Sequence, residues 1–160
     1  MKNKFAKGVC LGWIILFVVS CNTKNESAPV ADKDQVKKDI QAKENDFAAL
    51  YNSGQLKDIG YYADDATTFF PNRAPLVGKQ AIVDFLKSDL DSNTDKISFS
   101  TNEVFVSDNG NQVVEVGYFK LVDSSNVTIN TGNYMSLFEK RNDKYVCVRD
   151  MSASDMPVKN

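Results

Sequence analysis

Two neighbouring carboxylates, Asp64 and Asp65, are the first residues of this chain that could do chemistry. They lie in the stretch YYADDATTFFP, residues 61 to 71. Paired carboxylates can share general acid and general base work, whereas aspartates in a turn accept backbone N–H groups. The chain contains no histidine, which removes the commonest general base at neutral pH and excludes Ser-His-Asp and Cys-His nucleophile schemes. The pair is therefore either acid–base machinery, a turn into a strand, or part of an ion site.

Glu115 and Asp150 are two further candidate bases, each inside an apolar stretch. Both faces of residues 112–122 are largely apolar, so strand alternation does not decide whether Glu115 points inward. Asp150 shares a strand face with Val146 and Val148. A carboxylate enclosed by apolar groups has a raised pKa and can accept a proton near neutrality. The alternatives are a solvated Glu115 and an Asp150 paired with backbone or with a lysine.

The N-terminus has the pattern of a targeting segment. Three lysines in the first seven residues precede an apolar run over residues 8–19. Twelve apolar residues are too few to span a bilayer as a helix. The run ends in VVSC, residues 18 to 21. An ordinary secretory signal with an incidental cysteine is the alternative to the interpretation that follows.

The VVSC stretch resembles the lipobox of bacterial lipoproteins. The resemblance implies that residues 1–20 are a signal peptide and that Cys21 is acylated and becomes the mature N-terminus. Several acyl chains on one residue hold a protein stably on a membrane, which a single chain does not. Residues 21–33 are then a polar tether, and the protein is expected in the bacterial cell envelope. We expect the domain to be anchored to the outer membrane, and the sequence leaves undecided whether it lies on the periplasmic or the outer face.

Composition limits the remaining classes. The 160 residues are 42% hydrophobic and 25% charged, as in one globular domain. The net charge of −2 provides no basic surface for nucleic acid. Cys147 has no partner for an intramolecular disulfide and lies in the apolar run YVCV, which predicts a buried side chain. No cluster of metal-ligand residues is evident, so we expect neither a metal nor another cofactor.

Helical spacing comes first along the chain and strand-like segments follow. Val36, Ile40, Phe47 and Leu50 form one stripe of a long helix that ends before Gly54. The remaining predicted elements are a short helix through residues 56–62, a short strand at 66–70, a helix near 81–90, and strands at 97–106, 112–122, 127–140 and 145–152. This order predicts an α+β fold, with the helices packed on one face of an antiparallel sheet.

Several stretches together resemble the SnoaL-like and ketosteroid-isomerase-like domains of the nuclear transport factor 2-like superfamily, including the group named domain of unknown function 4440. They are NSGQLKDIGYYADDATTFFPN, GKQAI and GNYMSLFEKRNDKYVCVRDMSASD. The resemblance covers residues 34–156 and leaves residues 157–160 as a tail. It implies a cone in which helices close a bent sheet around an apolar cavity. It also implies that Asp64 and Asp65 lie in the turn before the first strand, outside the cavity, and that Glu115 and Asp150 point into it.

The same resemblance places apolar residues where ketosteroid isomerases keep their catalytic groups. Phe47 stands at the tyrosine position, Phe70 at the base position and Met135 near the oxyanion acid position. A phenylalanine can neither take nor give a proton. We therefore expect a cavity without exchangeable protons. The candidate cavity-lining residues are Phe47, Tyr51, Tyr62, Phe70, Phe85, Phe119 and Met135.

Three functions remain in competition. The first is non-catalytic binding of a small apolar ligand or a partner protein by a membrane-tethered cone. The second is an isomerase, cyclase or dehydratase that uses Glu115 or Asp150 as general base. The third is an interaction module whose open sheet face forms a homodimer or binds a partner.

Overall fold

The computed structural model describes residues 31–157. The predicted signal peptide, Cys21 and nearly all of the tether lie outside these residues, as do residues 158–160, so the lipoprotein interpretation stays a prediction. Within the described residues, no helix combines the length and the apolar character needed to cross a membrane.

Helix α1, Lys33–Asn52, begins at a side-chain cap. The Asp32 carboxylate accepts hydrogen bonds from the backbone N–H groups of Asp34 and Gln35, at 3.0 and 3.2 Å. These contacts satisfy two of the donors that a helix N-terminus leaves free. The predicted apolar stripe is the buried face, and Ile40 is completely buried.

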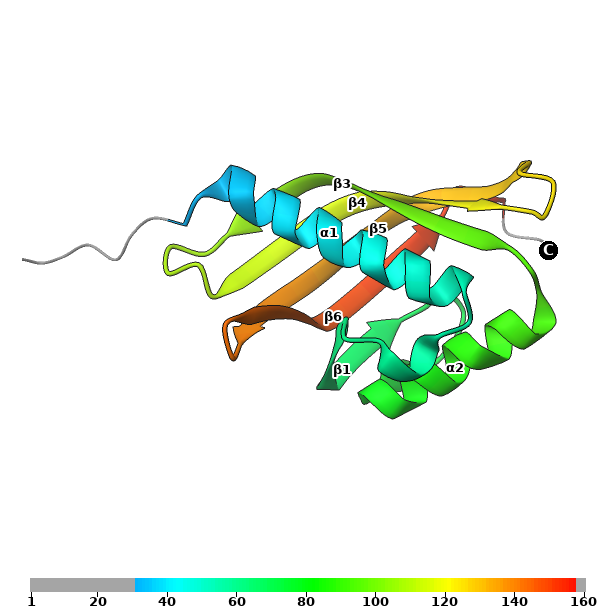
Figure 1. Cartoon of the computed structure of the whole chain (residues 1–160), viewed down its shortest axis with the longest axis horizontal. Coiled ribbons are helices and arrows are strands. Elements are labelled where there is room, and N and C mark those ends of the chain that lie inside the picture. Colours follow the sequence, from blue (N-terminus) through cyan, green and yellow to red (C-terminus); the bar gives the residue numbers. More distant parts are fainter. Residues whose placement is uncertain (1–30, 158–160) are drawn as a thin grey trace, which may run out of the picture.

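The sheet has six strands in the order β2-β1-β6-β5-β4-β3. The strands are β1 (Tyr62–Phe69), β2 (Leu76–Val77), β3 (Lys96–Val106), β4 (Gln112–Val122), β5 (Thr128–Arg141) and β6 (Lys144–Ser154). Strands β3 to β6 form an antiparallel meander, whereas β1 pairs with β6 in parallel. Figure 1 shows α1 lying across one face of the curved sheet, with α2, Lys79–Ser92, near β1. The α+β prediction is confirmed.

Two local predictions near the start of the sheet are wrong. The expected second helix is a single 3-10 turn, Leu56–Asp58, and Tyr62 is already the first residue of β1. The strand thus begins four residues earlier than residue 66. Its partner is β6, about eighty residues further along the chain, and Tyr62 pairs with Cys147. Such distant pairing overrides the local helical spacing.

Helix α1 is fixed to the free edge of β3 by two amide side chains. Gln41 accepts from the backbone N–H of Thr101 at 2.8 Å and donates to the carbonyl of Phe99 at 3.3 Å. Asn52 accepts from the N–H of Ile97 at 2.8 Å and donates to its carbonyl at 2.9 Å. These bonds satisfy edge groups that would otherwise need another strand.

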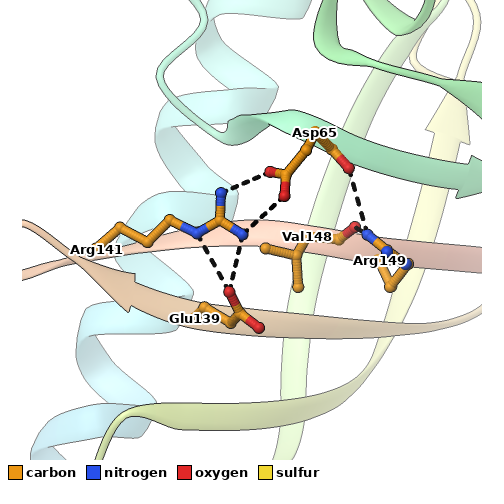
Figure 2. Close-up of polar contacts among 5 residues, drawn as sticks. All are labelled: Asp65, Glu139, Arg141, Val148 and Arg149. Atoms are coloured by element: carbon orange, nitrogen blue, oxygen red, sulfur yellow. Dashed lines mark hydrogen bonds and ion pairs between the residues drawn. The ribbon is translucent and has the colours of Figure 1, made fainter.

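Asp64 and Asp65 lie within β1 and outside the hollow, with exposed side chains. Figure 2 shows the guanidinium of Arg141 between the carboxylates of Asp65 and Glu139. Its two terminal nitrogens donate to the two oxygens of Asp65, at 2.5 and 3.1 Å. This hydrogen bonding to Arg141 lowers the pKa of Asp65. Arg149 donates to backbone carbonyls of Asp65 and Val148. Asp65 therefore joins strands β1 and β5 on the outer surface, and the predicted place of the carboxylate pair in a turn is wrong.

Candidate functional site

A cavity of about 260 Å³ lies between the two helices and the sheet. Its lining residues are Glu44, Phe47, Tyr51, Tyr61, Tyr62, Phe70, Phe85, Leu86, Asp89, Ile97, Phe99, Phe119, Leu121, Asn130, Tyr134, Asp150 and Ser152. Most of these side chains are aromatic or aliphatic. The volume is slightly below the range of about 300–1,000 Å³ that is usual for small-molecule pockets. It suits a molecule built on a single ring.

Six of the seven predicted lining residues lie on this cavity, and Met135 does not. Side chains alternate along β5, and the buried Tyr134 and Ser136 occupy the inner face. Met135 therefore points to the outer face, where it is 47% exposed and pairs with Met151 of β6. Its predicted position in the hollow is wrong.

Asp150 comes from β6 and lies on the cavity wall, where its side chain is half-buried. The hydroxyl of Tyr62 donates to one oxygen at 3.2 Å, and the hydroxyl of Ser136 donates to the other at 3.3 Å. Burial raises the pKa of Asp150 to about 6, although both hydroxyl bonds favour the charged form. This carboxyl group can exchange a proton close to neutral pH.

Glu115 lies on the inner face of β4 but is completely buried behind the cavity wall. Its Oε1 atom accepts from the hydroxyls of Thr101 and Tyr134, at 2.6 and 2.8 Å. The Tyr134 ring occupies the space that a side chain at Gly117 would fill. Gly117 thus permits the contact between Tyr134 and Glu115. Direct access to a ligand favours Asp150 over Glu115 as the base.

Glu44 is the interior residue that sequence reasoning missed. It is 1% exposed and projects from α1 into the cavity wall. The hydroxyl of Tyr61 donates to its Oε1 atom at 2.5 Å. The sequence contains a sign of this position, because Glu44 lies eight residues after Val36 and so falls on the same helical stripe as Ile40 and Phe47. A carboxyl group on the buried stripe of a helix is unusual enough to mark a site.

Glu44 and Glu115 interact directly. Burial raises the pKa of Glu44 well above its usual range, and the nearby charge of Glu115 raises it further. Burial also raises the pKa of Glu115, against the hydrogen bonds from Thr101 and Tyr134. The Oε2 atom of Glu115 accepts from no N–H or hydroxyl group of the described residues. The raised pKa of Glu44 favours its protonated form, which lets the two carboxyl groups stay buried with one charge.

Two hydroxyl groups, those of Tyr61 and Ser136, lie between this pair and Asp150. The Tyr61 hydroxyl lies 2.5 Å from Glu44 and 3.4 Å from the hydroxyl of Ser136, which in turn contacts Asp150. Three carboxyl groups therefore share one polar network inside the cone. The expectation of a hollow without exchangeable protons is wrong, even though Phe47 and Phe70 are apolar and lie on the cavity as predicted.

No group of three or more acids and cysteines within residues 31–157 is arranged to hold a metal ion. Cys147 is buried as predicted, and burial raises the pKa of its thiol.

Comparison with solved structures identifies the fold. An NTF2-like protein with a cystatin-like fold from Novosphingobium aromaticivorans superposes with a TM-score of 0.66 at 14% identity, over 78% of this chain and 85% of that one. A cystatin-like domain of unknown function from Nostoc punctiforme gives 0.67 at 11% identity, over 76% and 78%. A ketosteroid isomerase-like protein from Erwinia carotovora atroseptica gives 0.62 at 16% identity, over 78% and 99%.

These similarities define the class of protein as an α+β cone of the NTF2-like, cystatin-like type. At these identities they establish the fold and not an activity. No family model matches the sequence. No curated protein matches it significantly.

The raised pKa of Asp150 predicts a pH-dependent stability. The folded pKa of about 6 exceeds the ordinary value of 3.8, so its stabilising contribution is complete below pH 3.8 and is lost as pH rises through 6. Asp150→Asn removes this titration. Relative to Asp150→Asn, the wild-type protein should lose up to about 3 kcal/mol of unfolding free energy between pH 4 and pH 7.5, and less where cavity water solvates the carboxylate. Urea unfolding at both pH values measures the difference.

Ser152→Ala is the matched control, because Ser152 lines the same cavity from the same strand but does not titrate. Its effect should be the same at both pH values. If the difference in unfolding free energy between the wild type and Asp150→Asn is the same at both pH values, the Asp150 carboxyl group is not held in an environment that raises its pKa.

Proposed function

We propose that the domain binds a small, largely apolar molecule that carries one polar group, inside the cavity under α1. The main support for this proposal is an apolar cavity that has Asp150, Tyr62 and Tyr134 on its wall. Ligand sites of this kind combine apolar walls with a few polar groups that orient the ligand. Rigid elements hold all of these residues, which keeps the ordering cost of binding low.

Filling the cavity tests this proposal. Ser152→Phe places a ring inside the cavity, whereas Ala153→Phe places the same ring on the exposed side of β6. Benzyl alcohol is a suitable neutral probe, followed by amide chemical shifts in NMR spectra of the purified protein. The wild type and Ala153→Phe should bind it, and Ser152→Phe should weaken binding at least tenfold. Equal binding by both variants would place the probe elsewhere on the protein.

A second candidate function is proton abstraction from the bound molecule, with Asp150 as general base. The supporting observation is a carboxyl group on the cavity wall with a pKa of about 6, fixed by the hydroxyls of Tyr62 and Ser136. An isomerase, cyclase or dehydratase needs a base of this strength close to the reacting carbon. Glu115, the other candidate base, would act only through the network because it does not line the cavity.

Deuterium exchange distinguishes catalysis from binding alone. In D₂O at pH 7.5, the protein should accelerate exchange of the acidic C–H groups of 2-indanone, a small cyclic ketone. Asp150→Asn should slow this exchange by about 10²–10⁴-fold, the usual contribution of a general base. Asp64→Asn, at an exposed site outside the cavity, should leave it unchanged. Equal exchange rates for the wild type and Asp150→Asn would rule out Asp150 as the base and leave ligand binding as the only proposed function of the cavity.

We further propose that the cone is tethered to a membrane of the bacterial envelope through Cys21. The support is the sequence VVSC after a basic and apolar segment, followed by a polar stretch before α1. The eleven residues between Cys21 and Lys33 can span up to about 40 Å when extended. The cavity would then be within reach of molecules at or near the membrane surface.

Expression of the full chain with Cys21→Ala tests the anchor. The wild-type protein should enter the detergent phase on Triton X-114 partition, and Cys21→Ala should remain in the aqueous phase because it lacks acyl chains. Cys10→Ala, a matched change within the apolar segment, should behave as wild type. Detergent partition of Cys21→Ala would argue against acylation at this residue.

A further inference from the structure

The ionisable side chains on the cavity wall are acidic or phenolic. Three carboxyl groups face it, from Glu44 on α1, Asp89 on α2 and Asp150 on β6. None of the lining residues is a lysine or an arginine, and the chain has no histidine. The electrostatic potential inside the cavity therefore favours a positive charge over a negative one.

Asp150 has hydrogen-bond partners but no partner of opposite charge among the described residues. Its side-chain donors are the neutral hydroxyls of Tyr62 and Ser136, and the backbone of Met151 also hydrogen-bonds it. The ion pairs within residues 31–157 join Arg141 to Asp65 and to Glu139 on the outer surface. Buried carboxylates are normally paired with a cation. The cavity beside Asp150 is where a ligand can supply one.

The titratable groups that act on Asp150 belong to several elements. They are Glu44 on α1, Tyr61 just before β1, Tyr62 on β1, Glu115 on β4 and Cys147 on β6. Each of them is neutral or negative in every protonation state. None can neutralise an ionised Asp150, and an ammonium group in the cavity can.

The aromatic walls favour the same ligand charge. Phe47, Phe70, Phe85 and Phe99 present rings to the cavity, and ring faces attract cations. Phe85 already has a cation over its ring, since the guanidinium of Arg73 lies 4.1 Å from the ring centroid. Arg73 is exposed and is not a lining residue, so solvent screens its charge from the interior.

We propose that the cavity selects a small apolar amine, one ring bearing a primary or secondary ammonium group, and binds the ammonium against the carboxylate of Asp150. This inference rests on the proposed ligand-binding function and names the class of ligand. The ring would contact the phenylalanine walls, while the ammonium would donate hydrogen bonds to Asp150 and complete its charge pairing.

Charge pairing makes binding depend on pH in a defined direction. A bound ammonium stabilises the ionised form of Asp150 and so lowers its pKa from about 6. Below that value the amine must displace a proton from Asp150, and its affinity should fall as pH decreases. A neutral ligand of the same shape has no such requirement.

Three probes that share one ring test the proposal on the purified protein, namely benzylamine, benzyl alcohol and benzoate. Calorimetry at pH 7.5 should show benzylamine binding at least tenfold more tightly than benzyl alcohol, with benzoate the weakest. At pH 5 this preference should shrink to threefold or less. Asp150→Asn should bind benzylamine and benzyl alcohol with similar affinity. Asp64→Asn should behave as the wild type.

Proton counting provides a second measurement that needs no variant. Benzylamine binding at pH 5.5 should release protons, visible as a calorimetric heat that changes with the ionisation enthalpy of the buffer, whereas benzyl alcohol should release none. Benzyl alcohol or benzoate binding as tightly as benzylamine would overturn the amine proposal and leave the cavity function standing. An amine preference that persists in Asp150→Asn would also overturn it. Failure of all three probes to bind would overturn the cavity function itself.

Discussion

The burial of two carboxyl groups, Glu44 and Glu115, in one interior is the constraint on which this cone depends. Two ionised carboxylates in this position would repel each other, and each buried charge costs several kcal/mol of hydration. Protonation of Glu44, whose pKa is raised well above its usual range, removes half of this charge. Through Tyr61 and Ser136 the same network reaches Asp150. The polar groups beneath the cavity thus lie close together in one interior cluster.

The cavity lies beneath a helix that is attached to the sheet near its middle and at its last residue. Gln41 and Asn52 join α1 to the backbone edge of β3 by hydrogen bonds, in addition to the packing of its buried face. The space beneath is bounded by aromatic rings, which leave Asp150 poorly hydrated. A single structural arrangement therefore provides both the room for a ligand and the unusual proton affinity of the group that meets it.

Regular spacing made most elements predictable. The α1 stripe from Val36 to Phe47 and the Val-rich and Phe-rich segments after residue 96 lie in the expected helix and strands. Prediction failed where pairing is distant, as for Tyr62, which joins β6 in place of a local helix. It failed for Met135 because the position implied by the resemblance is one residue out of phase with the inner face of β5, and strand alternation turns such an offset into the opposite face.

The amino-acid sequence by itself determined the class of fold, the absence of histidine chemistry and the apolar character of Phe47 and Phe70, since these follow from residue types and local periodicity. Only the tertiary structure decided that Glu44, Glu115 and Asp150 share one interior, while Asp65 pairs with Arg141 outside it. The physical reason is that burial and proton affinity depend on neighbours from distant strands and helices. A carboxylate has no special chemistry until those neighbours remove its water.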